Sequence, residues 1–177
     1  MTGLAVLAEA RWPETPDDVA APSLPGFVVS SFSALAAEVA ERCLSRREAV
    51  VVSGASGTDR PVTAVVMVSA LGDVVSAVHV ADAVDSGGRV GPLLFFQSVP
   101  NSVAGHVAAR WQLTGPVVSV GGMEAGLDIA ALLIEDADAD EALLIRVEQA
   151  CDGGADTGDR AEAVLVAEAV LVAEEER

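Results

Sequence analysis

Lysine is absent from this sequence, and its ten basic residues are all arginine. Set against 27 aspartates and glutamates, they leave a formal net charge of -17. Nucleic acids and anionic membranes repel so acidic a chain, so we expect neither as a partner. The missing lysine also excludes a phosphate-binding loop. Residues 53–60, SGASGTDR, lack the Gly-Lys-Ser/Thr sequence of that loop and predict a turn.

Cysteine and histidine are almost as scarce. Cys43 and Cys151 are far apart and match no metal-ligand spacing, so we expect reduced thiols, no metal site and no cofactor. A Ser-His-Asp or Cys-His site would need His79 or His106 beside a serine or cysteine. His106 lies among small and apolar residues, which favours a satisfied, partly buried histidine. His79, three residues before Asp82, indicates a pair on a helix surface.

Long uncharged apolar runs are also missing, because proline and glycine interrupt the longest ones. No segment predicts a membrane span, and residues 3–8 are too short for a signal peptide. We therefore expect a soluble cytoplasmic protein. Its 177 residues, 51% of them hydrophobic, are enough for one domain with a real core.

Strand and helix patterns alternate along the chain. Helical spacing predicts helices over 33–44, 74–84, 101–111 and 124–136, and β-rich runs predict strands over 4–8, 62–69, 117–120, 142–149 and near 162–173. Residues 12–26 and 91–100 predict loops, 50–61 a strand end with a turn, and 151–159 a hairpin loop. This order indicates an α/β fold with a mixed, mostly parallel sheet and helices on both faces.

The predicted helix at 124–136 has no polar face across its middle turns. Leu127, Ile129 and the run Ala130–Ile134 surround it with apolar side chains. A helix of this kind must be covered on all sides, and one sheet covers only one of them. We therefore expect a partner or a second copy of the chain to cover the rest.

Two motifs resemble known ligand sites but lack residues that those sites require. GGMEAG, residues 121–126, follows a strand and opens a helix, but it does not match the dinucleotide fingerprint G-x-G-x-x-G. EDADADE, residues 135–141, begins like a calcium loop. It lacks the glycine and the final glutamate that such a loop requires, so it predicts a solvated helix-to-strand loop.

Residues 100–120, PNSVAGHVAARWQLTGPVVSV, resemble a segment of the β-ketoacyl synthases, the ketosynthases of fatty acid and polyketide assembly. Those enzymes carry a Pro-Asn-x-x-Ala-Gly helix, a Gly-Leu-x-Gly-Pro-type turn and a strand that ends at the nucleophile. The likeness is specific over about 85–150 and looser upstream. The positions that match are Pro100, Asn101, Ala104, Gly105, Leu113, Gly115 and Pro116.

The resemblance implies a thiolase-like fold, in which two similar α/β halves enclose a central helix layer. Only the N-terminal half is matched, so we expect residues 1–177 to form a single truncated ketosynthase-like domain. The missing half would then explain the uncovered helix at 124–136.

The departures from the family concern catalysis. Where ketosynthases carry Asp-Thr-Ala-Cys-Ser-Ser, this chain has GGMEAG, and the corner at Gly122, Met123 and Glu124 lacks the nucleophilic cysteine. The family's catalytic histidines and lysine lie in the half that is not matched. The resemblance therefore implies a vestigial nucleophile corner with no catalytic residue.

The leading hypothesis is a non-catalytic accessory protein of type II polyketide or fatty-acid-like biosynthesis, acting as a homodimer or as a heterodimer with a full-length ketosynthase. The alternatives are a small acyl-transfer or acyl-hydrolysing enzyme using Glu124 or Ser119, and a protein that binds an acyl chain without chemistry.

In the family, the strand before the nucleophile pairs across a two-fold axis. The corresponding strand here is apolar and uncharged, and such an edge should not stay open in a soluble protein. We expect an interface at Phe95, Phe96, Val99, Asn101, Trp111, Val117, Val118, Ser119 and Val120. The alternative is that Phe95, Phe96 and Trp111 fill the core of the monomer.

Contact with an acyl carrier protein is a weaker expectation, because carriers are acidic too. The one local exception is the cluster Arg42, Arg46 and Arg47. Favourable placement of cations at a helix C-terminus is the explanation we prefer for this cluster.

Overall fold

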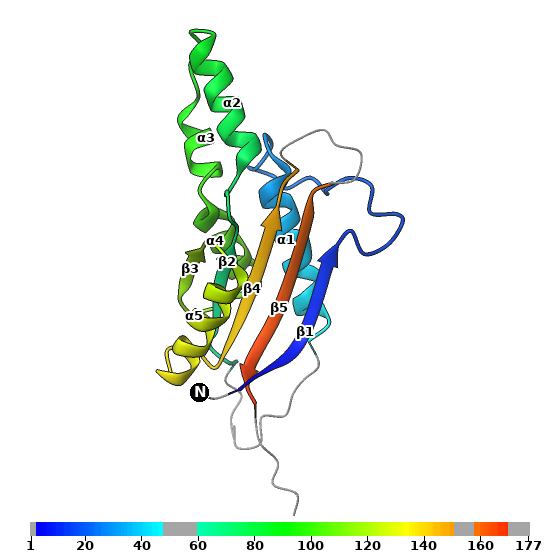
Figure 1. Ribbon diagram of the computed structural model, residues 1–177, viewed down its shortest axis with the longest axis vertical. Helices are drawn as coiled ribbons and strands as arrows, with labels where there is room; N and C mark the ends of the chain where they lie inside the picture. Colours follow the sequence, from blue (N-terminus) through cyan, green and yellow to red (C-terminus); the bar gives the residue numbers. More distant parts are fainter. Residues whose placement is uncertain (1–2, 48–59, 151–157, 170–177) are drawn as a thin grey trace, which may run out of the picture.

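The computed structural model describes residues 3–47, 60–150 and 158–169 as a five-stranded sheet with helices on both faces (Figure 1). Most predicted elements form within one or two residues of their expected bounds. The elements in chain order are β1 (Leu4–Trp12), α1 (Ser31–Ser45), β2 (Thr63–Val68), α2 (Val74–Asp85), α3 (Pro92–Gln97), α4 (Pro100–Trp111), β3 (Val117–Val120), α5 (Met123–Glu135), β4 (Glu141–Glu148) and β5 (Arg160–Glu168).

The strands lie in the order β1-β5-β4-β2-β3. β2 pairs in parallel with β3 and β4, whereas β5 pairs antiparallel with both β4 and β1. The mixed α/β sheet is thus confirmed, but the parallel part covers only one side of it. The connection from β4 to β5 is too short for the crossover helix that a parallel pair requires, so β5 returns antiparallel.

Each face of the sheet carries its own core. On one face α1 and α4 pack over alternate strand residues. The core on this face includes Phe32 and Leu35 of α1 and Met67 of β2. On the other face α5 packs over β2 and β4 through the small residues Gly126 and Ala130. All six residues of β2 are buried, as expected for a central strand covered on both faces.

Three sequence-based boundaries were wrong. The predicted loop at 91–100 contains α3, which starts at a proline, a residue suited to the first helical turn. β1 extends to Trp12 because its whole length pairs with β5, and β5 begins earlier than expected and is strand to Glu168. The turns predicted within 50–59 and 151–157, and the strand predicted beyond 169, lie outside the described residues.

α2 and α3 extend beyond the end of the sheet, on the side where β3 lies (Figure 1). We call these two helices the arm. Only Ser76 of α2 is buried. The N-terminus of α2 is fixed to the N-cap of α1, because Asp73 accepts hydrogen bonds from the Ser76 amide (3.0 Å), the Ser76 hydroxyl (2.7 Å) and the hydroxyl of Ser30, the α1 N-cap (2.6 Å).

Candidate functional site

The corner between β3 and α5 is a tight strand-to-helix turn. Gly122 is the N-cap in an extended conformation, and its carbonyl accepts the Gly126 amide at 3.0 Å. Met123 packs against the core under α5, whereas Glu124 is exposed. A carboxylate in the first turn is favourable at the positive end of the helix dipole. Glu124 therefore has a helix-stabilising role in this position.

No catalytic partner reaches this corner from the described residues. Glu124 makes no hydrogen bond or ion pair there. His79 is exposed on α2, and His106 is half-buried on α4, where its ring meets Phe27 edge-on at 6.0 Å. Cys43 lies on the opposite face of the sheet, and burial raises the pKa of its thiol to about 11. An acyl-enzyme would need a thiolate or an activated hydroxyl, and neither is supplied by these groups.

Among the strands that the structure describes, β3 is an edge strand and is hydrogen-bonded only to β2. Its four residues alternate between exposed Val117 and Ser119 and half-buried Val118 and Val120. The side chains of Ser119 and Asn101 are hydrogen-bonded, so β3 is tied to the first turn of α4. The other edge of this strand offers unpaired backbone groups next to the corner.

The expected interface residues near this edge divide into two groups. Phe95 is 78% exposed and Phe96 62%, and Val99 is exposed too. The alternative that these phenylalanines fill the monomer core was therefore wrong. Trp111 is half-buried, packs on the main core and donates its Nε1 hydrogen to Glu41 at 3.1 Å. For Trp111 the core alternative agrees with the structure.

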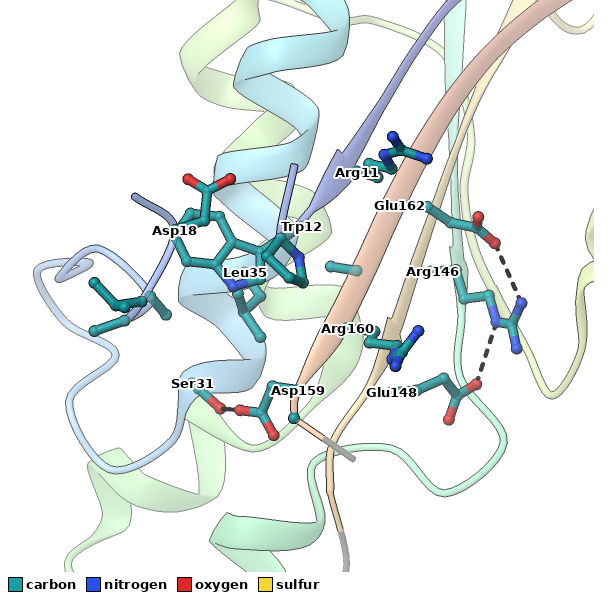
Figure 2. A pocket seen from close by; sticks show the side chains of 16 residues that line it. Arg11, Trp12, Asp18, Ser31, Leu35, Arg146, Glu148, Asp159, Arg160 and Glu162 are labelled. Atoms are coloured by element: carbon teal, nitrogen blue, oxygen red, sulfur yellow. Dashed lines mark hydrogen bonds and ion pairs between the residues drawn. The ribbon is translucent and has the colours of Figure 1, made fainter. Parts of the chain in front are cut away.

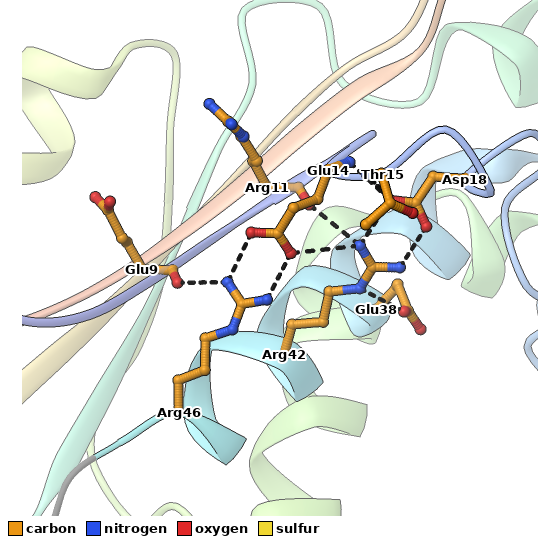
Figure 3. A network of polar contacts seen from close by, with 8 residues as sticks. All are labelled: Glu9, Arg11, Glu14, Thr15, Asp18, Glu38, Arg42 and Arg46. Atoms are coloured by element: carbon orange, nitrogen blue, oxygen red, sulfur yellow. Dashed lines mark hydrogen bonds and ion pairs between the residues drawn. The ribbon is translucent and has the colours of Figure 1, made fainter.

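All three clustered arginines are engaged by carboxylates of this chain. Figure 3 shows Arg42 in a bidentate contact with Asp18 (2.7 and 2.9 Å) and Arg46 in one with Glu14. Arg42 also binds Glu38 and lies over the Trp12 ring at 4.8 Å.

These contacts fix the charge states of the cluster. The hydrogen bonds from Arg42 hold the pKa of Asp18 well below its usual range, and Arg46 lowers the pKa of Glu14. Arg47, the third arginine, pairs with buried Glu141 at 2.9 Å. Carrier binding here stays a prediction, and it would have to compete with these ion pairs.

Sequence analysis missed a cleft of about 900 Å³ at the end of the sheet (Figure 2). It lies beside the end of β1 and the start of β5. Arg11, Glu162 and Arg146 form one cross-strand row along it, with Arg146 3.2 Å from Glu162. The alternating charges of RVE in β4 and RAE in β5 were the available signal. The lining contains three arginines and four carboxylates, so charges of both signs face this cleft.

Within the described ranges, no three His, Cys, Asp or Glu side chains are placed to hold a metal ion. Nor is any described helix both long and apolar enough to cross a membrane.

Several solved structures resemble this chain. A ketosynthase (ApeO) in complex with its chain length factor (ApeC) from Xenorhabdus doucetiae matches with a TM-score of 0.64 and 22% identity, over 85% of this chain and 64% of that one. The ishigamide ketosynthase/chain length factor matches with a TM-score of 0.64 and 20% identity, over 85% and 47%. A β-ketoacyl synthase from Burkholderia phymatum matches with a TM-score of 0.63 and 16% identity, over 89% and 47%.

The chain thus spans about half to two thirds of the length of these structures, which share its thiolase-like fold. Curated protein sequences contain no match. The family profile described as "Beta-ketoacyl synthase, N-terminal domain" matches residues 8–177, nearly the whole sequence. With its five-stranded mixed sheet and its altered corner after β3, the chain belongs to the β-ketoacyl synthase family through that N-terminal domain.

Proposed function

We propose that this protein is a non-catalytic partner subunit of a ketosynthase in type II polyketide or fatty-acid-like biosynthesis. The observation that carries the proposal is the corner itself. It keeps the strand-to-helix geometry but presents Met123 and exposed Glu124, with no cysteine or histidine of the described residues beside it. A family member without a nucleophile must act by binding rather than by acyl transfer.

The neighbouring edge supports a pairing role. β3 is uncharged and lies at the edge of the described sheet. The exposed residues Phe95, Phe96 and Val99 precede it in the chain. From Val90 to Met123 the sequence has one formal charge, at Arg110. Two of the similar structures are named as pairs of a ketosynthase with a chain length factor. An uncharged apolar edge next to a disarmed corner suits an accessory chain in such a pair.

The absence of chemistry is tested by incubating the protein with malonyl- and acyl-carrier substrates. We expect no decarboxylation, transfer or hydrolysis above the rate without protein, and no change in Glu124→Ala. Turnover that Glu124→Ala abolishes would instead support the small acyl-transfer or hydrolysing enzyme.

The pairing is tested by co-expression with a full-length ketosynthase from the same genome and light scattering of the purified complex. Val118→Arg places an unpaired charge on β3 and should abolish the complex. Val19→Arg is the control, because Val19 is almost fully exposed in a loop away from β3. A Val118→Arg protein that still assembles would contradict pairing at this edge.

A further inference from the structure

The sequence that forms β5 occurs twice in the chain. Residues 161–168 read AEAVLVAE, and residues 167–174 repeat the same eight letters. The first copy and Arg160 make up β5, whereas most of the second copy lies beyond residue 169, outside the described part of the chain. The second copy starts six residues after the first. A shift of the strand by six residues would therefore replace each side chain of the first copy with an identical one.

The even offset keeps every side chain on its own face of the sheet. Successive residues of a strand point to opposite faces, so a shift by one residue would turn Leu165 away from the core. A shift by six instead brings Leu171 to the place of Leu165, which is fully buried in the core that α1 covers. The burial of apolar side chains, which fixes the register of most strands, therefore does not distinguish these two registers.

Both neighbours of β5 would accept the second copy. β5 lies between β1 and β4 and forms eight antiparallel residue pairs with each of them. Glu162 lies opposite Arg11 on β1 and Arg146 on β4, and Glu168 would lie opposite the same two arginines after the shift. Along β4, only the residue opposite Glu148 changes its type, from arginine to valine. The ladder on both sides is thus retained in either register.

The two registers differ at the start of the strand, where Asp159 holds the described one. Its carboxylate accepts hydrogen bonds from the Ser31 hydroxyl and, at 3.0 Å, from the Ala150 amide (Figure 2). Hydrogen bonds to a carboxylate are stronger than those between neutral groups. The shift would put Leu165 in the place of Asp159, so both bonds would be lost. It would also lengthen the connection after β4 by six residues, but loop entropy rises only slowly with length.

We propose that β5 has two registers, the described one, held by Asp159, and a second one in which residues 167–174 take the place of 161–168. In the second register Asp159 and Arg160, which line the cleft at the end of the sheet, would leave it. The cleft would lose one carboxylate and one guanidinium group while the five-stranded sheet is retained. β5 is thus a two-state element that sets the charges of this cleft.

Disulfide trapping measures the second register directly. In a Cys151→Ser background, the variant Arg146→Cys with Glu168→Cys brings two thiols opposite each other only after the shift. In the described register Arg146 lies opposite Glu162, six residues away along β5 and beyond the reach of a disulfide. We expect oxidised glutathione to form an intramolecular disulfide in this variant. Asp159→Ala should raise its rate about tenfold, because two hydrogen bonds that favour the described register are removed.

Leu171→Asp is the matched control, because it puts a charge into the core only in the second register. It should abolish the disulfide between positions 146 and 168, and leave the one formed by Arg146→Cys with Glu162→Cys unchanged. A disulfide between 146 and 168 that forms equally fast with Leu171→Asp would overturn the proposal. So would its absence in Asp159→Ala, or a disulfide that links two molecules on a non-reducing gel and thus indicates strand exchange.

Stability gives an independent readout. An aspartate in place of buried Leu165 should unfold a sheet that has only one register. With two registers, Leu165→Asp keeps a folded sheet, because Leu171 takes the vacated place in the core. We expect a higher urea midpoint for Leu165→Asp than for Leu165→Asp with Leu171→Asp, and the wild-type midpoint for Leu171→Asp alone. Equal midpoints for the first two variants would overturn the second register.

Discussion

At the scale of single residues, the ionisation of Asp18 affects the stability of the loop that follows β1. Its carboxylate is held by Arg42 and by the amides of Glu14 and Thr15, and its pKa lies well below the usual value of 3.8. A carboxyl with a lowered folded-state pKa stabilises the protein above its unfolded pKa, and that contribution is lost as the pH falls. The loop network is therefore an acid-sensitive element.

We predict that Asp18→Asn is less stable than wild type at neutral pH, but loses less further stability on acidification below about pH 4. Urea unfolding at a series of pH values measures this difference. The matched control is Asp82→Asn, since Asp82 is exposed on α2. Parallel acid curves for wild type and Asp18→Asn would contradict the prediction.

Gly115 occupies a position that has no room for a side chain. A methyl group there would lie 2.5 Å from the carbonyl carbon and oxygen of Thr63, at the point where the Gly115 amide donates to that oxygen. We predict that Gly115→Ala lowers the free energy of unfolding by about 1–3 kcal/mol. Gly105→Ala is the control. That position in α4 is open, and alanine should stabilise the helix by about 0.5–1 kcal/mol. Urea denaturation measures both, and equal effects would refute the steric argument.

At the level of the element, α2 depends on its N-cap. We predict that Asp73→Ala lowers the free energy of opening α2 by about 1–2 kcal/mol, because the cap and the partner of the buried Ser76 hydroxyl are lost together. Amide exchange should accelerate across α2 while α1 remains protected. Asp82→Ala on the same helix is the control. Uniform acceleration in both helices would indicate global destabilisation instead.

Elements with strong periodicity or long β-branched runs could be predicted from the sequence. β2 and α4 lie where their patterns indicate, because burial decides both. α3 could not be found in this way, since six residues, four of them large and apolar, show no helical period. The length of β1 could not be predicted from its own sequence either, because pairing with the distant strand β5 extends it to Trp12.

The candidate site was partly predictable for a similar reason. The corner after β3 follows from a local pattern of strand, glycines and helix, and it lies where expected. Exposure does not follow from such a pattern. Phe95 and Trp111 are both aromatic and close in sequence, yet only Trp111 finds Glu41 and the main core within reach. Which one is buried depends on packing between elements.

On the scale of the whole molecule, α5 carries the apolar face that the sequence had suggested would need a cover. Leu127 and Leu132 of α5 are 39% and 50% exposed. We predict that Leu127→Glu with Leu132→Glu changes the free energy of unfolding by less than about 1 kcal/mol and lowers binding of the dye ANS. Val28→Glu, an exposed loop position, is the control and should leave the dye signal unchanged. An unfolded double variant would show that these leucines are structural.

The row Arg11–Glu162–Arg146 has a consequence for anything that settles on the α5 face. Water now solvates these side chains, and a second protein layer laid over them would have to strip that water from three charges at once. Such a layer is penalised unless it brings hydrogen-bonding groups in matching positions. A covering chain can therefore pack on α5 without this cost, but it must desolvate the three charged side chains if it extends over β1 and β5. The row thereby favours a partner that either stops short of these strands or carries polar groups that match the three charges.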